Sequence, residues 1–201
     1  TEAPDEPALG RDAGVLAGCG ELGVEITASL RGNPDVLVDF TVPAATLQRA
    51  EECVENEVAM VVGTTGFSQE QLSVLREETA VHIPLLLAPN MGLGVNLLFK
   101  LVRQMTRMTD ENWNVEIVEA HHNNKKDAPS GTAGKLASIV CEEREWNPEE
   151  VVRHGREGAV GERPAREIGM HAVRGGSITG NHTVLFAGAG ETIEITHRAA
   201  T

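Results

Sequence analysis

Cysteine is scarce in this 201-residue chain, which contains only Cys19, Cys53 and Cys141. They are odd in number, lie far apart and form no C-x-x-C pair, so the sequence predicts neither a disulfide framework nor a zinc ribbon. We interpret them as reduced thiols of a cytoplasmic protein. No apolar run approaches ~18 residues and no charged-then-apolar leader is visible, so neither a membrane span nor a signal peptide is indicated.

Positive charge is also scarce, because 17 lysines and arginines stand against 30 aspartates and glutamates, a net charge of −13. Proteins that bind nucleic acids present basic surfaces to the phosphates, so this balance argues against a nucleic-acid partner. Hydrophobic residues still make up 41% of the chain, which favours a globular protein with one or two domains.

Several motifs of nucleotide and hydrolase chemistry are absent from the sequence. There is no Walker loop and no G-x-S-x-G elbow, and the G-x-G-x-x-G fingerprint of dinucleotide-binding folds is missing. The pair Gly18 and Gly20 does not replace that fingerprint, because neither a strand before it nor a helix after it is indicated. Since the chain starts at Thr1 and stops at Thr201 just after a strand-like run, we expect a fragment whose first βα unit lies upstream.

A regular alternation of strands and helices begins near residue 35, after a loop-like stretch in which only residues 23–27 could form a short strand. Compact apolar runs predict strands buried on both faces, and a capping box of Ser68 and Gln71 opens one of the helices between them. Strands are expected at 35–40, 58–62 and 83–87, and helices at 43–56 and 68–79. This spacing is typical of parallel βαβ units, so we predict an α/β fold with a truncated Rossmann-like sheet.

The second half of the chain has a different pattern. Helices are expected at 94–108 and 130–145, and strands at 114–121, 168–173, 183–186 and 192–197. Glycine-rich loops at 175–176 and 188–190 suggest that the last three strands pair antiparallel. We therefore predict a second, α+β domain with an open mixed or antiparallel sheet.

The turns that follow the first three strands form a candidate ligand site, because ligands of parallel sheets bind beyond the carboxyl ends of the strands. These turns begin at Phe40, Gly63 and Ala88. They contain glycine, small hydroxyl and amide residues, which allow a dinucleotide to approach the backbone closely. Any one of them could equally be an ordinary βα turn.

Residues 119–133, between an expected strand and an expected helix, contain two histidines and two lysines. Ser130 suits a helix N-cap, which leaves the N–H groups of Gly131 and Thr132 free to bind an anion. His121 and His122 point to opposite faces of a strand, so they are poorly arranged to chelate one metal, and no metal site is expected. An acid/base role beside Lys125 suits a small acidic substrate that needs proton transfer.

This stretch closely resembles the signature of the 4-hydroxy-tetrahydrodipicolinate reductase (dihydrodipicolinate reductase) family. The resemblance continues in residues 62–67, 88–91 and 190–197 and covers most of the chain from about Gly10. It implies a cytoplasmic enzyme of diaminopimelate and lysine biosynthesis, commonly a homotetramer, that reduces a cyclic dicarboxylate with NADPH or NADH. Residues 1–92 would be a partial dinucleotide-binding domain, and residues 93–201 a substrate-binding and tetramerisation domain.

The resemblance also implies roles for individual residues. His121 would be the catalytic acid/base and Lys125 the proton donor. The implied substrate ligands are His122, Ser130, Gly131 and Thr132. The implied cofactor contacts are Phe40, Gly63, Thr64, Thr65, Ala88, Pro89, Asn90 and Met91.

Departures from the family pattern leave alternatives open. The glycine fingerprint and the C-terminal segment are missing, and Gly92 stands where serine is frequent, so we expect weak or no cofactor binding and no activity for this chain alone. One alternative is a non-catalytic module that binds small carboxylates. Another is a two-domain dehydrogenase of the homoserine or aspartate type, against which the spacing of the histidines, Lys125 and Ser130 argues.

Overall fold

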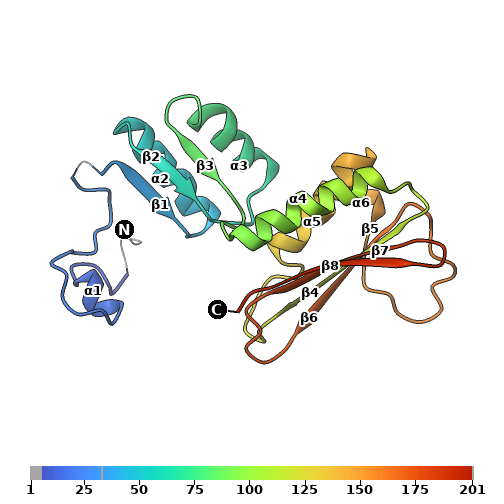
Figure 1. Cartoon of the computed structure of the whole chain (residues 1–201). Coiled ribbons are helices and arrows are strands. Elements are labelled where there is room, and N and C mark those ends of the chain that lie inside the picture. The colour runs from blue at the N-terminus through green and yellow to red at the C-terminus, as the bar shows by residue number, and fades with distance from the viewer. Residues whose placement is uncertain (1–5, 33, 201) are drawn as a thin grey trace. The chain divides into compact units, whose positions relative to one another are not determined.

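The computed structural model describes residues 6–32 and 34–200. The chain divides into two compact units, a first unit, Thr1–Leu87, and a second unit, Ala88–Thr201 (Figure 1). Each unit has its own hydrophobic core.

The first unit is built around three parallel strands in the order β1-β2-β3. Its main elements are β1 (Val36–Asp39), α2 (Pro43–Glu55), β2 (Ala59–Val62), α3 (Gln69–Ser73), η1 (Val74–Thr79) and β3 (Leu85–Leu87). The parallel βαβ arrangement expected of a Rossmann-like sheet is confirmed. Its central strand β2 places Met60 and Val62 in a core with Ala50, Cys53 and Leu75.

Local sequence explains how the helices of this unit begin. Pro43 occupies the first turn of α2, where its missing N–H costs nothing, and Ser68 and Gln71 form the expected capping box of α3. The helix expected to residue 79 is present, but its second half, Val74–Thr79, is a π-helix and not an α-helix. Its wider turn is visible in the bond from the Ala80 N–H to the Leu75 carbonyl, 3.0 Å long.

Two further expectations for the first unit are wrong. The edge strand β1 is not buried on both faces, since Val36 and Val38 are 48% and 62% exposed. The short strand expected at 23–27 is reduced to an isolated bridge between Asp12 and Glu25, beside the four-residue helix α1 (Ala13–Leu16). The Asp12 carboxylate accepts backbone N–H groups there, so a side chain takes the place of a strand partner.

The second unit contains a five-stranded mixed sheet in the order β5-β6-β4-β7-β8. Its elements are α4 (Leu93–Met108), β4 (Asn114–His121), α5 (Gly131–Arg144), α6 (Pro148–Val151), β5 (Val152–His154), β6 (Ile168–Arg174), β7 (Asn181–Ala187) and β8 (Thr192–Arg198). The central strand β4 pairs parallel with β6 and antiparallel with β7. The expected mixed sheet is confirmed, while β5 and α6 were not expected.

The antiparallel pairing expected for the last three strands holds for β7 and β8 but is wrong for β6. The chain leaves β6, crosses the end of β4 and enters β7 on the other side. Gly175 donates its N–H to the His121 carbonyl at 2.9 Å, and Asn123 donates to the Gly176 carbonyl at 3.2 Å. The glycine-rich turn at 175–176 is therefore a crossover against the end of β4, and not a hairpin.

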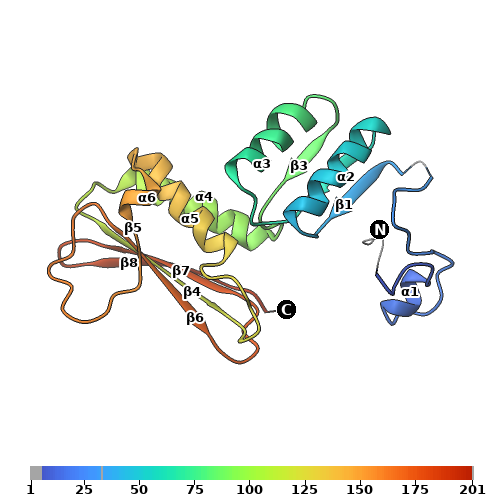
Figure 2. The same cartoon turned by 180° about the vertical axis from the view of Figure 1, so that it is seen from behind.

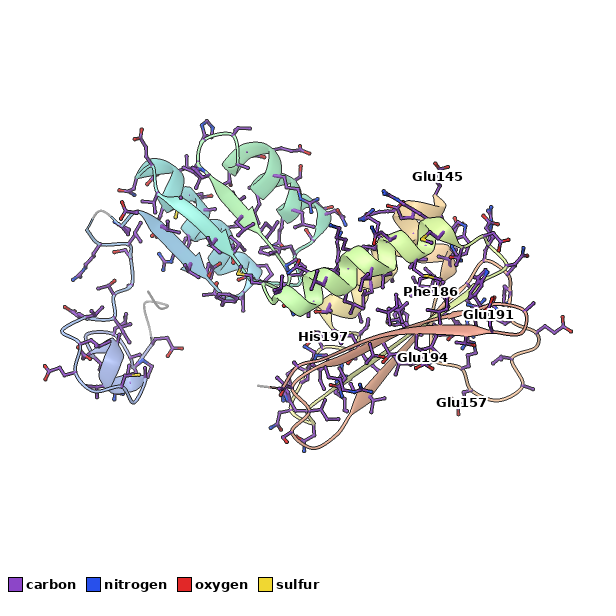
Figure 3. The ribbon with its side chains drawn as sticks, in the orientation of Figure 1. Glu145, Glu157, Phe186, Glu191, Glu194 and His197 are labelled. Atoms are coloured by element: carbon purple, nitrogen blue, oxygen red, sulfur yellow. The ribbon has the colours of Figure 1, made fainter. Side chains whose placement is uncertain are left out.

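Helices α4 and α5 pack against each other on one face of the five-stranded sheet (Figures 1 and 2). Strand β4 alternates along its whole length, so that Val115, Ile117, Glu119 and His121 all face these helices. Phe186 is fully buried between β7 and the helices (Figure 3). No helix or strand among residues 88–200 covers the opposite face of the sheet, but Arg156 and Arg163, from the loop between β5 and β6, bind Glu116 there. The buried face thus ends, toward residue 121, in two ionisable side chains.

Candidate functional site

The carboxylate of Glu119 lies at the centre of the candidate site and is completely buried. Its Oε2 accepts from Nδ1 of His121 at 2.6 Å, and its Oε1 accepts from the Ser130 N–H at 3.1 Å. Arg174, on the neighbouring strand β6, donates to both oxygens at 2.7 and 2.8 Å. Three separate parts of the chain therefore meet on one carboxylate.

Glu119 is ionised despite its burial. Burial alone would raise the pKa of this carboxyl, but the hydrogen bonds from Arg174, His121 and Ser130 outweigh it and hold the pKa below its usual range. A carboxylate only accepts hydrogen bonds, so Nδ1 of His121 carries the hydrogen. Its Nε2 has no hydrogen-bond partner among the described residues and is left for a ligand.

A second buried histidine lies beside the first. The rings of His121 and His182 are arranged edge to face, with their centroids 5.2 Å apart. Nε2 of His182 is 3.0 Å from Oγ of Ser130, which also accepts the Ala133 N–H at 3.2 Å. Burial is the main cause that lowers the pKa of His182 to about 4, so this ring is neutral near pH 7.

Ser130 is the N-cap of the 14-residue helix α5, as expected. Its N–H donates to Glu119, and its hydroxyl is bonded to His182 and to the Ala133 N–H, so Ser130 connects three parts of the site. The next two N–H groups, of Gly131 and Thr132, have no hydrogen-bond partner in the part of the chain that is described. They lie at the positive end of α5, which favours an anion.

The remaining loop residues lie at the surface of the same site. Nζ of Lys125 is 2.8 Å from Oδ1 of Asp127, and the Lys125 side chain is 21% exposed. His122 is half-buried, and its carbonyl accepts the Lys125 N–H, which makes a tight turn. His122 lies just beyond β4, whose last residue is the buried His121, so their expected placement on opposite faces stays a prediction.

Asn90, in the turn at 88–91, contacts the first turn of α5, and both segments belong to the second unit. Its Nδ2 is 3.5 Å from Oγ1 of Thr132, and its Oδ1 accepts the Gly92 N–H at 2.8 Å. Asn96 donates to the carbonyls of Asn90 and Gly92 and fixes the first turn of α4. The four expected cofactor contacts Ala88, Pro89, Asn90 and Met91 thus lead directly into α4 and approach the start of α5.

The other expected cofactor contacts lie in the first unit, beyond the ends of β1 and β2. Thr64 is buried, accepts the Thr41 N–H at 2.9 Å and donates to Asp39 at 3.3 Å. Phe40 is 66% exposed, and its ring lies so close to Gly63 that a Cβ there would be 2.0 Å from it. Thr65, next in the chain, is exposed. These tight turns present backbone and small hydroxyl groups at one edge of the sheet.

Three site residues were missed from the sequence: Glu119 as an anchor, Arg174 and His182. The signal for Glu119 was present, because it alternates with Val115 and Ile117 and so had to be buried. No comparable signal existed for Arg174 and His182. They reach the site only because β6 and β7 flank β4.

Neither a metal cluster nor a helix able to span a membrane is found among the described residues. The described residues contain no group of three or more histidine, cysteine, aspartate or glutamate side chains arranged to hold a metal ion. None of their helices is long and apolar enough to cross a membrane.

A Rossmann-like βαβ unit followed by a mixed-sheet unit is the plan of a class of NAD(P)H-dependent oxidoreductases. Residues 1–91 match the family described as dihydrodipicolinate reductase, N-terminus, and residues 94–201 match dihydrodipicolinate reductase, C-terminus. The chain belongs to the 4-hydroxy-tetrahydrodipicolinate reductase family, which reduces 4-hydroxy-tetrahydrodipicolinate with NAD(P)H in diaminopimelate and lysine biosynthesis.

Individual relatives agree with this assignment. The 4-hydroxy-tetrahydrodipicolinate reductases of Geotalea daltonii and Methanosphaera stadtmanae are each 48% identical, over 100% of this chain and 76% of their own length. A solved structure of dipicolinate-bound dihydrodipicolinate reductase from Paenisporosarcina sp. TG-14 is 33% identical, with a TM-score of 0.60. That comparison covers 83% of this chain and 62% of the other.

Proposed function

We propose that residues 119–133 form the substrate site, in which a cyclic dicarboxylate is bound and protonated during its reduction. The observation that carries this proposal is the pair of free N–H groups of Gly131 and Thr132 at the N-terminus of α5. They are ready donors for one substrate carboxylate. Lys125 and His122 supply donors for the second carboxylate. Lys125 would release its partner Asp127 and bind the substrate instead.

His121 is the acid that supplies the proton. Reduction of 4-hydroxy-tetrahydrodipicolinate to tetrahydrodipicolinate replaces a C–OH group by C–H and releases water. One hydride and one proton are therefore consumed for each turnover. Since Nδ1 of His121 is held by Glu119, its Nε2 is the atom that carries and delivers the proton. Since only one proton is consumed for each turnover, Lys125 would act as a proton donor by replacing the proton that His121 transfers, and it neutralises negative charge on the bound substrate.

A nicotinamide dinucleotide fits the turns that follow β1 and β2. Phe40 packs on Gly63, and a side chain at position 63 would displace that ring. Phe40, Gly63, Thr64 and Thr65 are proposed contacts of the nicotinamide side of the cofactor, as are Ala88, Pro89, Asn90 and Met91. The bound cofactor supplies the hydride. NADPH and NADH are both compatible with these contacts.

The assembled enzyme is proposed to be a cytoplasmic homotetramer. Support comes from the face of the five-stranded sheet opposite α4 and α5, which no described helix or strand of the second unit covers. An exposed sheet face that carries Val173, 47% exposed, favours contact with further copies of the chain.

The proposed roles are tested by His121→Ala and Lys125→Ala in the intact enzyme, with the absorbance of the nicotinamide followed in the presence of 4-hydroxy-tetrahydrodipicolinate. We expect a loss of kcat of about 10²-fold or more for His121→Ala, since a positioned acid contributes about that much. Lys126→Ala is the matched control, because Lys126 is exposed and adjacent to Lys125. Near-normal rates in both variants would refute the assignment.

Calorimetric titration with dipicolinate and then with NADH distinguishes the enzyme from the alternative, a module that binds carboxylates without catalysis. Binding of dipicolinate without any turnover by the intact enzyme would favour the module. A dehydrogenase of the homoserine or aspartate type would turn over an acyclic amino acid instead.

A further inference from the structure

We propose that Glu119 is a positioning residue, which fixes His121 and the N-terminus of α5 relative to each other through the two oxygens of one carboxylate. This inference deepens the proposed function and rests on it. Glu119 itself is sealed from solvent and touches no substrate, so its effect on the reaction passes through other residues.

The two oxygens of the Glu119 carboxylate hold two different groups. Oε2 of Glu119 holds the ring of His121, and Oε1 holds the backbone N–H of Ser130. Ser130 directly precedes Gly131 and Thr132, whose N–H groups face the proposed substrate carboxylate. One carboxylate thus holds both the ring of His121 and the residue that precedes the anion-binding donors. A substrate held by the donors is thereby placed in register with the acid.

Arg174 makes this anchor possible. A buried carboxylate without a cationic partner would be strongly disfavoured and would take up a proton. The guanidinium of Arg174 binds both oxygens of Glu119, and its planar fork also fixes the orientation of the carboxylate. The same guanidinium donates to the Asp127 carbonyl at 2.7 Å. His121, the Asp127 backbone and Ser130 are therefore all tied to the Glu119–Arg174 pair.

Glu119 also determines the tautomer of His121. While Glu119 accepts at Nδ1, the hydrogen of the neutral ring is confined to Nδ1, and Nε2 is left to exchange protons with the substrate. A glutamine at position 119 has one oxygen and one NH₂ group. With its oxygen toward Ser130, its NH₂ group would donate to Nδ1 and shift the ring hydrogen to Nε2. The bond that Nη1 of Arg174 donates to the same position would be lost, while the bond from Nη2 to the oxygen remains. The volume of the side chain would hardly change.

The experiment compares Glu119→Gln with the wild type in two independent measurements. In the intact enzyme we expect kcat to fall by about 10²-fold, the contribution of a positioned acid, with a smaller rise in the KM for the dicarboxylate. In this chain, ¹⁵N NMR of labelled histidines at alkaline pH reports the tautomer directly. We expect Nδ1–H for His121 in the wild type and loss of that preference in Glu119→Gln.

The matched control is Glu116→Gln. Glu116 lies on the same strand and is also held by arginines and a histidine, Arg156, Arg163 and His171, but on the opposite face. We expect an unchanged His121 tautomer and near-normal kcat for this variant. An equal loss of kcat in both variants, with the tautomer of His121 unaffected, would assign Glu119 a purely structural role and overturn the proposal.

Two further outcomes keep the proposal open to refutation. If Glu119→Gln does not fold, the wild-type spectrum decides, because a hydrogen on Nε2 of His121 would contradict the proposed anchor. If the wild-type enzyme does not reduce the dicarboxylate at all, the proposed function fails. The tautomer measurement still supports or refutes the positioning role of Glu119 in that case.

Discussion

His182 couples the stability of the second unit to pH. Burial, and next the positive charge of a neighbouring histidine, lower its folded-state pKa to about 4 from an ordinary 6.5. The unfolded chain therefore binds more protons between these values, so the stability contributed by a neutral His182 is fully present above pH 6.5. It is lost as the pH falls toward 4.

The resulting prediction is a fall in the free energy of unfolding, on the order of 1–3 kcal/mol, as the pH drops from 6.5 to 4. Urea unfolding at a series of pH values measures it. In His182→Gln the upper part of this slope, between pH 6.5 and 5, should flatten. That window avoids Glu116, whose pKa of about 2 makes its contribution disappear only below about pH 4.5. An unchanged slope in the variant would contradict the assignment to His182.

Gly180 leaves room for the ring of His121. A Cβ at this position would lie 3.1 Å from Nε2 of His121, which is closer than ordinary van der Waals contact. The ring cannot retreat easily, because Glu119 holds its other nitrogen at 2.6 Å. We predict that Gly180→Ala lowers kcat by roughly 10-fold through a displaced acid, with little change in the melting temperature. Steady-state kinetics and thermal unfolding test this.

The control for that substitution is Gly175→Ala. A Cβ at Gly175 meets nothing within 4 Å, and its backbone N–H bond to the His121 carbonyl is retained. Wild-type kcat in Gly180→Ala, or the same loss in both variants, would argue against crowding of His121.

Residues of the site were predictable where their positions depend only on their near neighbours in the sequence. The N-cap Ser130 and the free N–H groups after it follow from local rules of helices. Arg174 does not, because its approach to Glu119 depends on which strand lies beside β4.

At the scale of elements, Ser130 stabilises the start of α5. We predict that Ser130→Ala lowers the free energy of unfolding by about 2 kcal/mol, because it removes the N-cap and leaves Nε2 of His182 buried without its hydroxyl partner. Ser138→Ala, within the same helix, should cost less than about 0.5 kcal/mol. Chemical denaturation of both variants measures the difference. Equal effects would show that the cap contributes little.

The bounds of β4 and the start of α5 were predicted well because strong local patterns define them. The pairing of β6 was not, because two glycines suggest a tight turn but do not reveal that the turn crosses β4. The π-helical turn of η1 was also missed, since one widened turn leaves the hydrophobic periodicity of the sequence almost unchanged.

At the scale of the whole molecule, the open face of the five-stranded sheet bears on assembly. Leu185 lies on that face, between Glu116 and Glu194 of the neighbouring strands. We predict that Leu185→Lys leaves the fold intact, because the new ammonium group lies beside the exposed Glu194, but converts the proposed tetramer to smaller species. Light scattering coupled to gel filtration measures this. Val160→Lys, in a loop and 48% exposed, is the control.

The division of the chain into two units follows from the change in sequence pattern near residue 90, from βαβ repeats to a sheet of longer strands. What the pattern could not provide is the strand order of the second sheet. That order determines which distant residues complete the site. The sequence therefore predicted the loop of residues 119–133 but not Arg174 and His182, which contact it from β6 and β7.

The central position of β4 has a consequence for how the enzyme matures. Glu119 contacts Arg174, 55 positions later in the chain, and Ser130 contacts His182, 52 positions later. The loop of residues 119–133 is therefore synthesised well before the residues that hold it in shape, and such distant contacts form slowly. Catalytic competence should be the last property a nascent chain acquires. It should also be the first one lost whenever β6 or β7 detaches.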